Sequence, residues 1–194
     1  MPHASKIAIP LPGFNTPLVG FEQPFEMLEA CHERVLRSLD LLRRAREHIA
    51  QHGHDADSRS ALTDVLRYFD IAGSLHHEDE ELHIFPALQD HPDATVRAAV
   101  AELQADHERM HAQWARLRQT LLRWRDDPAA PPPSDKDGTL IDEFIIGYEL
   151  HIPLEETVAY PAAHPFFDAD RLREIGEEMA RRRQVNPVPP QSRA

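Results

Sequence analysis

The stretch HHEDEELHIFPAL, residues 76–88, decides the fold together with a second stretch, HIPLEETVAYPAA, residues 151–163. Each begins with a histidine, has glutamates four and five residues later, and has a proline ten residues after the histidine. Residues four apart share one face of an α-helix and are separated by about 6 Å along its axis. The two stretches therefore predict helices that each present a histidine and a carboxylate on the same face.

Another pair of segments repeats in the same way. CHERVLRSLDLLR, residues 31–43, and DHERMHAQWARLR, residues 106–118, share His-Glu-Arg, a leucine ten residues after the histidine, and a closing arginine. His32 and His107 are 75 residues apart, as are His76 and His151. This order indicates two helix pairs of one design, related by a pseudo-twofold axis, with the four histidines at one level of a bundle.

The secondary structure follows from the distribution of the 17 prolines and 7 glycines, which cluster between long segments rich in Leu, Ala, Arg and Glu. These segments predict helices over about residues 24–51, 58–82, 91–125, 140–160 and 168–183. Residues 126–138 form a linker, and Pro153 interrupts or kinks the fourth helix. No segment alternates apolar and polar residues for long enough to predict a strand. The predicted fold is all-α: an up-down-up-down four-helix bundle with a short fifth C-terminal helix.

Length and composition favour one domain, because 194 residues with 41% hydrophobic side chains build one substantial core. We expect an N-terminal arm over residues 1–22, the bundle over residues 23–165, and a C-terminal helix with a disordered Pro-rich tail over residues 166–194. Cys31 is the only cysteine, so no internal disulfide forms and a reducing compartment fits. The N-terminal apolar run is cut by Pro10 and Pro12 and is too short for a signal peptide or membrane span. These features predict a cytoplasmic protein.

The charge balance bears on the partners. The 33 acidic residues outnumber the 21 basic ones, which gives a formal net charge of −12. Such a surface repels phosphate backbones and anionic lipids. We therefore expect neither nucleic acid nor a membrane as a partner, and the sequence leaves the oligomeric state open.

Histidine is the over-represented residue, with 13 copies, roughly three times the average for this length. Seven side chains are candidate metal ligands: the helical pairs His76/Glu80, His107/His111 and His151/Glu155, and His32 from the first helix. Burying unpartnered carboxylates would cost several kcal/mol each. A pair of metal ions removes this cost, because a carboxylate bridges both ions and each neutral imidazole donates a lone pair. Imidazole and carboxylate without thiolate favour iron, ahead of manganese or zinc.

At these residues the chain resembles the hemerythrin-like, or HHE cation-binding, domain family, over about residues 24–163. The resemblance rests on His32, on HHEDEE followed by FP, on HERMH, and on HIPLEE followed by YP. It implies two iron ions in a non-haem, oxo- or hydroxo-bridged centre, with an open position for dioxygen or another small ligand on the iron that has two histidines. The ligands it implies are His107, His111 and His151 on one iron, His32 and His76 on the other, and Glu80 and Glu155 as bridges.

Alternatives to these assignments remain open. His77 with Glu81 is also a pair four residues apart, and Glu156 could replace Glu155. The repeat favours His76 with Glu80, because both stretches then keep the same distance to their proline. A ferritin-like site needs Glu-x-x-His on two helices. That spacing occurs at Glu29/His32, Glu80/His83 and Glu108/His111, but not around His151.

The expected ligand pocket differs from that of oxygen-carrying relatives. They typically have a phenylalanine just after the second-helix ligand and a tryptophan one turn before the fourth-helix ligand, where this chain has His77 and Gly147. Val35 and Ile152 keep the pocket partly apolar. We therefore expect a protein that binds or senses dioxygen, with nitric oxide or peroxide next. Two further hypotheses are an enzyme that consumes peroxide or nitric oxide with His77 as proton donor, and an iron storage or donor protein.

Overall fold

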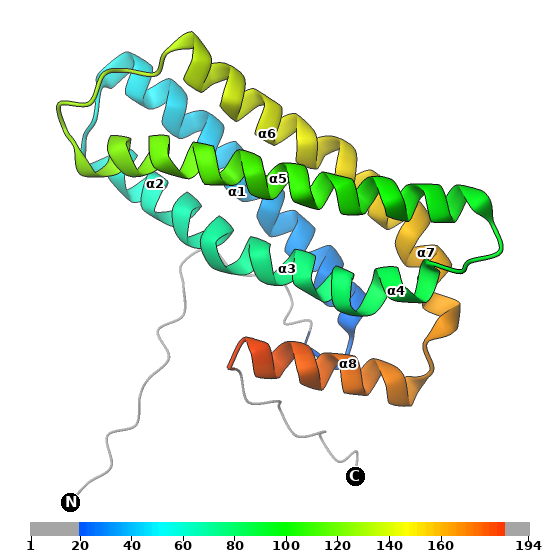
Figure 1. The fold of residues 1–194 in the computed structure, drawn as a ribbon. Helices are drawn as coiled ribbons and strands as arrows, with labels where there is room; N and C mark the ends of the chain where they lie inside the picture. The colour runs from blue at the N-terminus through cyan, green and yellow to red at the C-terminus, as the bar shows by residue number, and fades with distance from the viewer. Residues whose placement is uncertain (1–19, 185–194) are drawn as a thin grey trace, which may run out of the picture.

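The computed structural model describes residues 20–184, and within this range every regular element is helical. Four long rods run up and down beside one another, and a shorter helix packs against the side of this bundle (Figure 1). This confirms the predicted all-α bundle with a fifth C-terminal helix. Most of the expected N-terminal arm and Pro-rich tail, residues 1–19 and 185–194, lies outside the described residues.

The first two rods begin and end at clear sequence signals. Helix α1, Pro24–His52, has a proline in its first turn and ends at Gly53, whose φ of 80° suits a residue without a side chain. A capping box of Asp55 and Ser58 then starts the second rod. This rod is continuous and consists of α2 Ala56–Arg67, η1 Tyr68–Gly73, α3 Ser74–Asp79, η2 Glu80–Ile84 and α4 Phe85–Leu88.

The third rod is α5, Ala94–Asp126, capped by the Asp93 side chain. The fourth rod consists of α6 Asp135–Leu154, η3 Glu155–Ala159 and α7 Tyr160–Ala163, and it is followed by η4 His164–Phe166 and α8 Ala169–Arg182. The expected start near residue 140 was wrong by about one turn. A capping box of Ser134 and Asp137 starts α6 earlier, so the connection covers only residues 127–134. Pro153 does not end α6, which continues for one more residue before the backbone widens.

The second and fourth rods change helix type at matching places. The π-helical segments η2 and η3 begin 75 residues apart, and each leads into an aromatic residue followed by proline, Phe85-Pro86 and Tyr160-Pro161. Proline lacks an N–H, and its ring crowds the carbonyl four residues earlier, so a wider turn just before it relieves the conflict. The internal repeat of the sequence therefore extends to the backbone.

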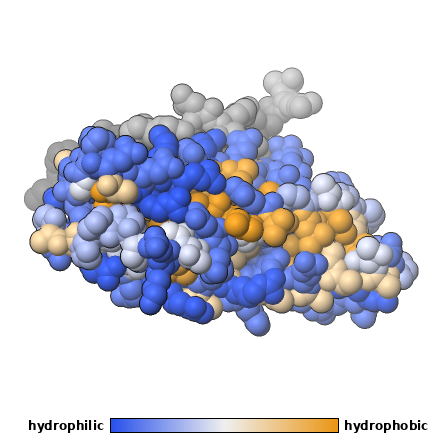
Figure 2. All heavy atoms as spheres, turned by 90° about the horizontal axis from the view of Figure 1, so that it is seen from above, coloured by the Kyte–Doolittle hydropathy of each residue, from blue (hydrophilic) through white to orange (hydrophobic). Residues whose placement is uncertain are grey.

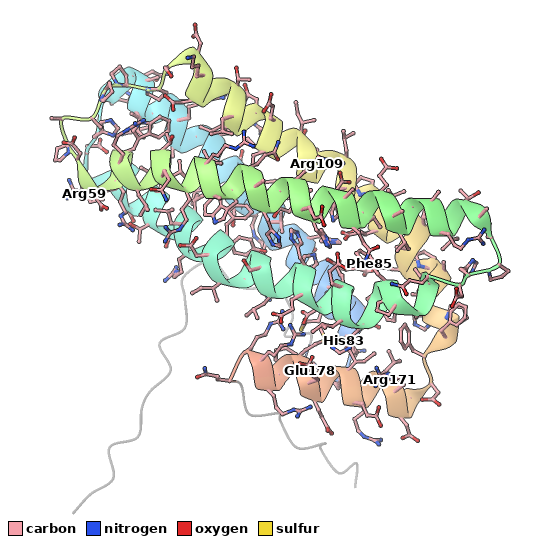
Figure 3. The ribbon with its side chains drawn as sticks, in the orientation of Figure 1. Arg59, His83, Phe85, Arg109, Arg171 and Glu178 are labelled. Atoms are coloured by element: carbon pink, nitrogen blue, oxygen red, sulfur yellow. The ribbon has the colours of Figure 1, made fainter. Side chains whose placement is uncertain are left out.

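Helix α8 lies against the second rod close to the middle of the bundle. The Asp79 carboxylate, 1% exposed, accepts hydrogen bonds from Arg182 and Arg183, with Arg183 Nη2 2.6 Å away. His83 Nε2 and Glu178 Oε2 are 2.7 Å apart, and both residues are labelled in Figure 3. The C-terminal helix is thus fixed by charged contacts to the segment that contains the motif HHEDEE.

The surface is mostly hydrophilic, but the face seen in Figure 2 carries a band of apolar side chains. Ile146 and Leu150 of α6 are 52% and 71% exposed. No helix among the described residues combines the length and the apolar character needed to cross a membrane.

Candidate metal centre

Histidine and glutamate side chains gather in the interior, where each is 0–3% exposed. The cluster comprises His32 from the first rod, His76, His77 and Glu80 from the second, His107 from the third, and His151 and Glu155 from the fourth. Apolar clusters lie on both sides of it. For example, Leu28 and Val35, which flank His32 on α1, belong to different clusters. The cluster is thus closed off from water at both ends of the bundle.

The side chains form two groups, in each of which the possible ligand atoms all lie within 4.8 Å of one another. One group is His77, His107 and His151, and the other is His32, His76, Glu80 and Glu155. The groups touch, since His151 Nε2 of the first group and Glu155 Oε1 of the second are 2.8 Å apart. The arrangement therefore offers two adjacent positions for a cation.

Both glutamates face the two groups at once. Glu155 Oε1 is 2.8 Å from His151 Nε2, while its Oε2 is 3.1 Å from His32 Nε2. Glu80 Oε1 is 3.5 Å from His76 Nε2, and its Oε2 is 3.5 Å from His107 Nε2. Each carboxylate is placed as a bridging ligand would be.

A second set of carboxylates orients the histidine rings from outside. Three contacts of this kind occur: His32 Nδ1 with Glu156 at 2.8 Å, His107 Nδ1 with Glu81 at 2.9 Å, and His151 Nδ1 with Asp106 at 3.4 Å. An ionised carboxylate only accepts, so each Nδ1 carries the proton and leaves the lone pair of Nε2 facing inward. This separates the glutamates that the sequence left as alternatives. Glu80 and Glu155 lie inside, whereas Glu81 and Glu156 hold histidines of other helices.

These residues fit a metal ion. The lone pairs of His107 Nε2 and His151 Nε2 meet at 3.1 Å, which requires a proton or a metal ion between them. Glu80 Oε2 and both oxygens of Glu155 are buried without a hydrogen-bond partner in the described structure. Acceptors left in this way cost on the order of 1–3 kcal/mol each. A cation satisfies all of them together, and nitrogen and oxygen donors without sulfur suit a first-row metal.

The charges of the cluster are distributed unevenly. Burial and the neighbouring charge of Glu155 raise the pKa of Glu80 well above its usual value. Burial would also raise the pKa of Glu155, but a proton on the facing nitrogens of His107, His151 and His32 outweighs burial and holds the pKa well below the usual value. Burial and the nearby histidines lower the pKa of His76 and of His77. The last two rings are therefore neutral, the form in which histidine binds metals.

The structure brings together six of the seven expected ligands and leaves out His111. That side chain is exposed and lies outside both groups, with its ring centroid 5.6 Å from that of His77. His77, expected as a pocket residue, lies inside a group instead. Among the other expected pocket residues, Val35 and Ile152 are buried. Gly147 faces α5, where Met110 Cε lies 3.8 Å from the position of an added Cβ.

Sequence reasoning missed Tyr160. Its ring stacks on His32 at 5.7 Å, and its hydroxyl donates a hydrogen bond to Glu80 Oε1. At the matching position of the repeat, Phe85 stacks on His107 at 5.5 Å and has no hydroxyl. The signal was present in the sequence as the aromatic residue that precedes the proline of each stretch. This difference makes the two halves of the centre chemically unequal.

Comparison with known proteins agrees with this site. The family model described as the hemerythrin HHE cation-binding domain matches residues 23–163, so the chain belongs to that family. A protein of Haemophilus influenzae (strain ATCC 51907 / DSM 11121 / KW20 / Rd), named only as an uncharacterized protein, is 35% identical over 165 residues. The match covers 85% of this chain and 92% of that protein. Family and geometry together identify a helical bundle with a buried metal-binding site.

Proposed function

We propose that this domain holds two iron ions and binds or senses dioxygen or a related small oxidant, such as nitric oxide or peroxide. The observation that carries the proposal is that Glu80 and Glu155 each face both groups of ligand atoms. Two bridging carboxylates support a shared pair of ions, and the donors without sulfur support iron.

Burial supports a small ligand. The residues of the two groups are at most 3% exposed, and Val35 and Ile152 are 0% and 5% exposed. A molecule of a few atoms can enter such an interior through small fluctuations, whereas a larger substrate requires the rods to separate. The site therefore favours a diatomic or similarly small partner.

The iron pair, when bound, would supply the electrons that an oxidant takes up. The protein's own side chains hold the site in shape and control its protons. Glu81, Glu156 and Asp106 fix the orientation of three histidine rings. The Tyr160 hydroxyl keeps a proton beside Glu80 Oε1, and apolar neighbours exclude water.

The test begins with anaerobic protein loaded with ferrous iron. On exposure to dioxygen, we expect two iron ions per chain and a visible charge-transfer absorption that the reduced protein lacks. An unchanged spectrum with dioxygen, nitric oxide and peroxide, in protein that retains both ions, would rule the proposal out. Sustained consumption of peroxide or nitric oxide would favour the enzymatic hypothesis. Rapid loss of iron to a mild chelator would favour storage.

Tyr160→Phe is expected to weaken iron binding by about 10- to 100-fold, the usual effect of removing a group that supports a ligand. The substitution removes only the hydroxyl that donates to Glu80. The control is Tyr68→Phe, because the Tyr68 hydroxyl donates to the backbone carbonyl of Cys31 instead of to a candidate ligand. Anaerobic titration with ferrous iron measures both variants. Equal affinities in the two variants would show that Tyr160 has no influence on the centre.

A further inference from the structure

We infer that His77, and not His111, supplies the third histidine beside His107 and His151. This inference rests on the proposed pair of iron ions and specifies one of their ligands. The His77 side chain is 3% exposed, and neither of its ring nitrogens has a hydrogen-bond partner among the described residues. One of these nitrogens lies within 4.8 Å of ligand atoms of both His107 and His151. A buried imidazole with no partner is costly unless another group, such as a metal ion, takes its lone pair.

The course of α5 explains why His111 lies outside. Between residues 107 and 121 of this helix the buried residues are His107, Met110, Leu117 and Leu121, with Trp114 partly buried between them. Met110 takes the inward direction one turn after His107. Its neighbour His111 is rotated by about 100° from it, because successive helical residues are spaced 3.6 to a turn. The side chain of His111 therefore lies at the rim of the bundle.

The internal repeat gives a second, independent argument. The residue 75 positions before His111 is Leu36, which is 45% exposed, and the residue 75 positions after His77 is Ile152, which is 5% exposed. His77 and its counterpart Ile152 are thus both buried, whereas His111 and its counterpart Leu36 are both exposed. The direction of these two side chains thus follows from the register of the rods.

Under this inference, the adjacent residues His76 and His77 of the second rod bind different ions. The ring of His76 lies 4.7 Å from that of His32, whereas the ring of His77 stacks on His107 at 4.0 Å. Both belong to α3, which lies between the π-helical segments η1 and η2. π-helical turns are frequent at functional sites. Since the two groups of ligand atoms lie side by side, neighbouring residues that point in different directions can each reach one of them.

The test compares His77→Ala with His111→Ala in the full chain loaded with ferrous iron under anaerobic conditions. Iron per chain and the number of histidines around iron, from X-ray absorption, are the readouts. We expect His77→Ala to lose at least one of the two ions, and to regain it when free imidazole is added. We expect His111→Ala to retain both ions. Circular dichroism checks the fold, and His77→Gln, which keeps a side chain of similar length, replaces His77→Ala if helicity is lost.

The inference is overturned if His111→Ala loses iron, or if the His77 variants retain both ions with an unchanged histidine count. The second result would show that His77 lines the ligand pocket beside the ions without binding either of them. Failure of the wild-type chain to bind two iron ions is a different result, because it would contradict the proposed function itself.

Discussion

Glu155→Ala is expected to abolish binding of both metal ions, reducing iron to well below one ion per chain. Glu155 is 0% exposed, and its two oxygens face His151 and His32, which belong to different groups. Removing it therefore takes one ligand from each position and leaves His151 without its nearest carboxylate. Elemental analysis after anaerobic loading measures the loss, and circular dichroism checks that the bundle persists.

Glu156→Ala is the matched control for this variant. Glu156 is the next residue in the chain, its side chain is 40% exposed, and it contacts Nδ1 of His32 from outside. Losing such an orienting group typically weakens metal binding by about 10- to 100-fold without removing a ligand. If Glu155→Ala retained both ions, or if Glu156→Ala were the more damaging change, Glu155 would not bridge the pair.

The double variant Arg182→Ala/Arg183→Ala is expected to destabilise the fold by about 3 kcal/mol, the lower end of the cost of breaking a buried ion pair. It leaves the carboxylate of Asp79, 1% exposed, without the two arginines that contact it. The lower end applies because the arginine side chains are themselves 16% exposed. Burial already raises the pKa of Asp79, and the arginines oppose that rise. Chemical denaturation of the metal-free protein measures the difference.

Arg173→Ala serves as the control on the same helix. Its partner is Asp170, and the two side chains are 63% and 81% exposed, so its loss should change stability by less than about 0.5 kcal/mol. Adding Asp79→Asn to the double variant should restore part of the stability, because the buried charge is then gone. Equal denaturation midpoints for all these proteins would show that α8 does not depend on Asp79.

The repeat made the fold and most of the site predictable. A period of 75 residues relates four histidines, the four glutamates of the two stretches and two prolines, and helical spacing then places His76 with Glu80 and His151 with Glu155 on one face. These predictions depend only on the geometry of a helix, so they do not require knowledge of how the helices pack against one another. They led to the bundle and to six of the side chains that the structure brings together.

The exposure of His111 could not be predicted from spacing alone, because it depends on how α5 is rotated about its own axis. His107 and His111 have the ideal separation, yet Met110 takes the inward direction between them. The roles of neighbouring glutamates depend likewise on contacts between helices, such as Glu81 with His107. The early start of α6 was missed because a local capping box outweighed Gly138 as a helix breaker.

Anomalous diffraction at the iron absorption edge, from crystals of the iron-loaded protein, tests the central claim most directly. We predict two iron peaks about 3.5–4 Å apart, a spacing typical of paired metal sites, lying between the carboxylates of Glu80 and Glu155. A single peak, peaks away from these carboxylates, or no peak in protein shown to be loaded with iron would contradict a shared pair of ions.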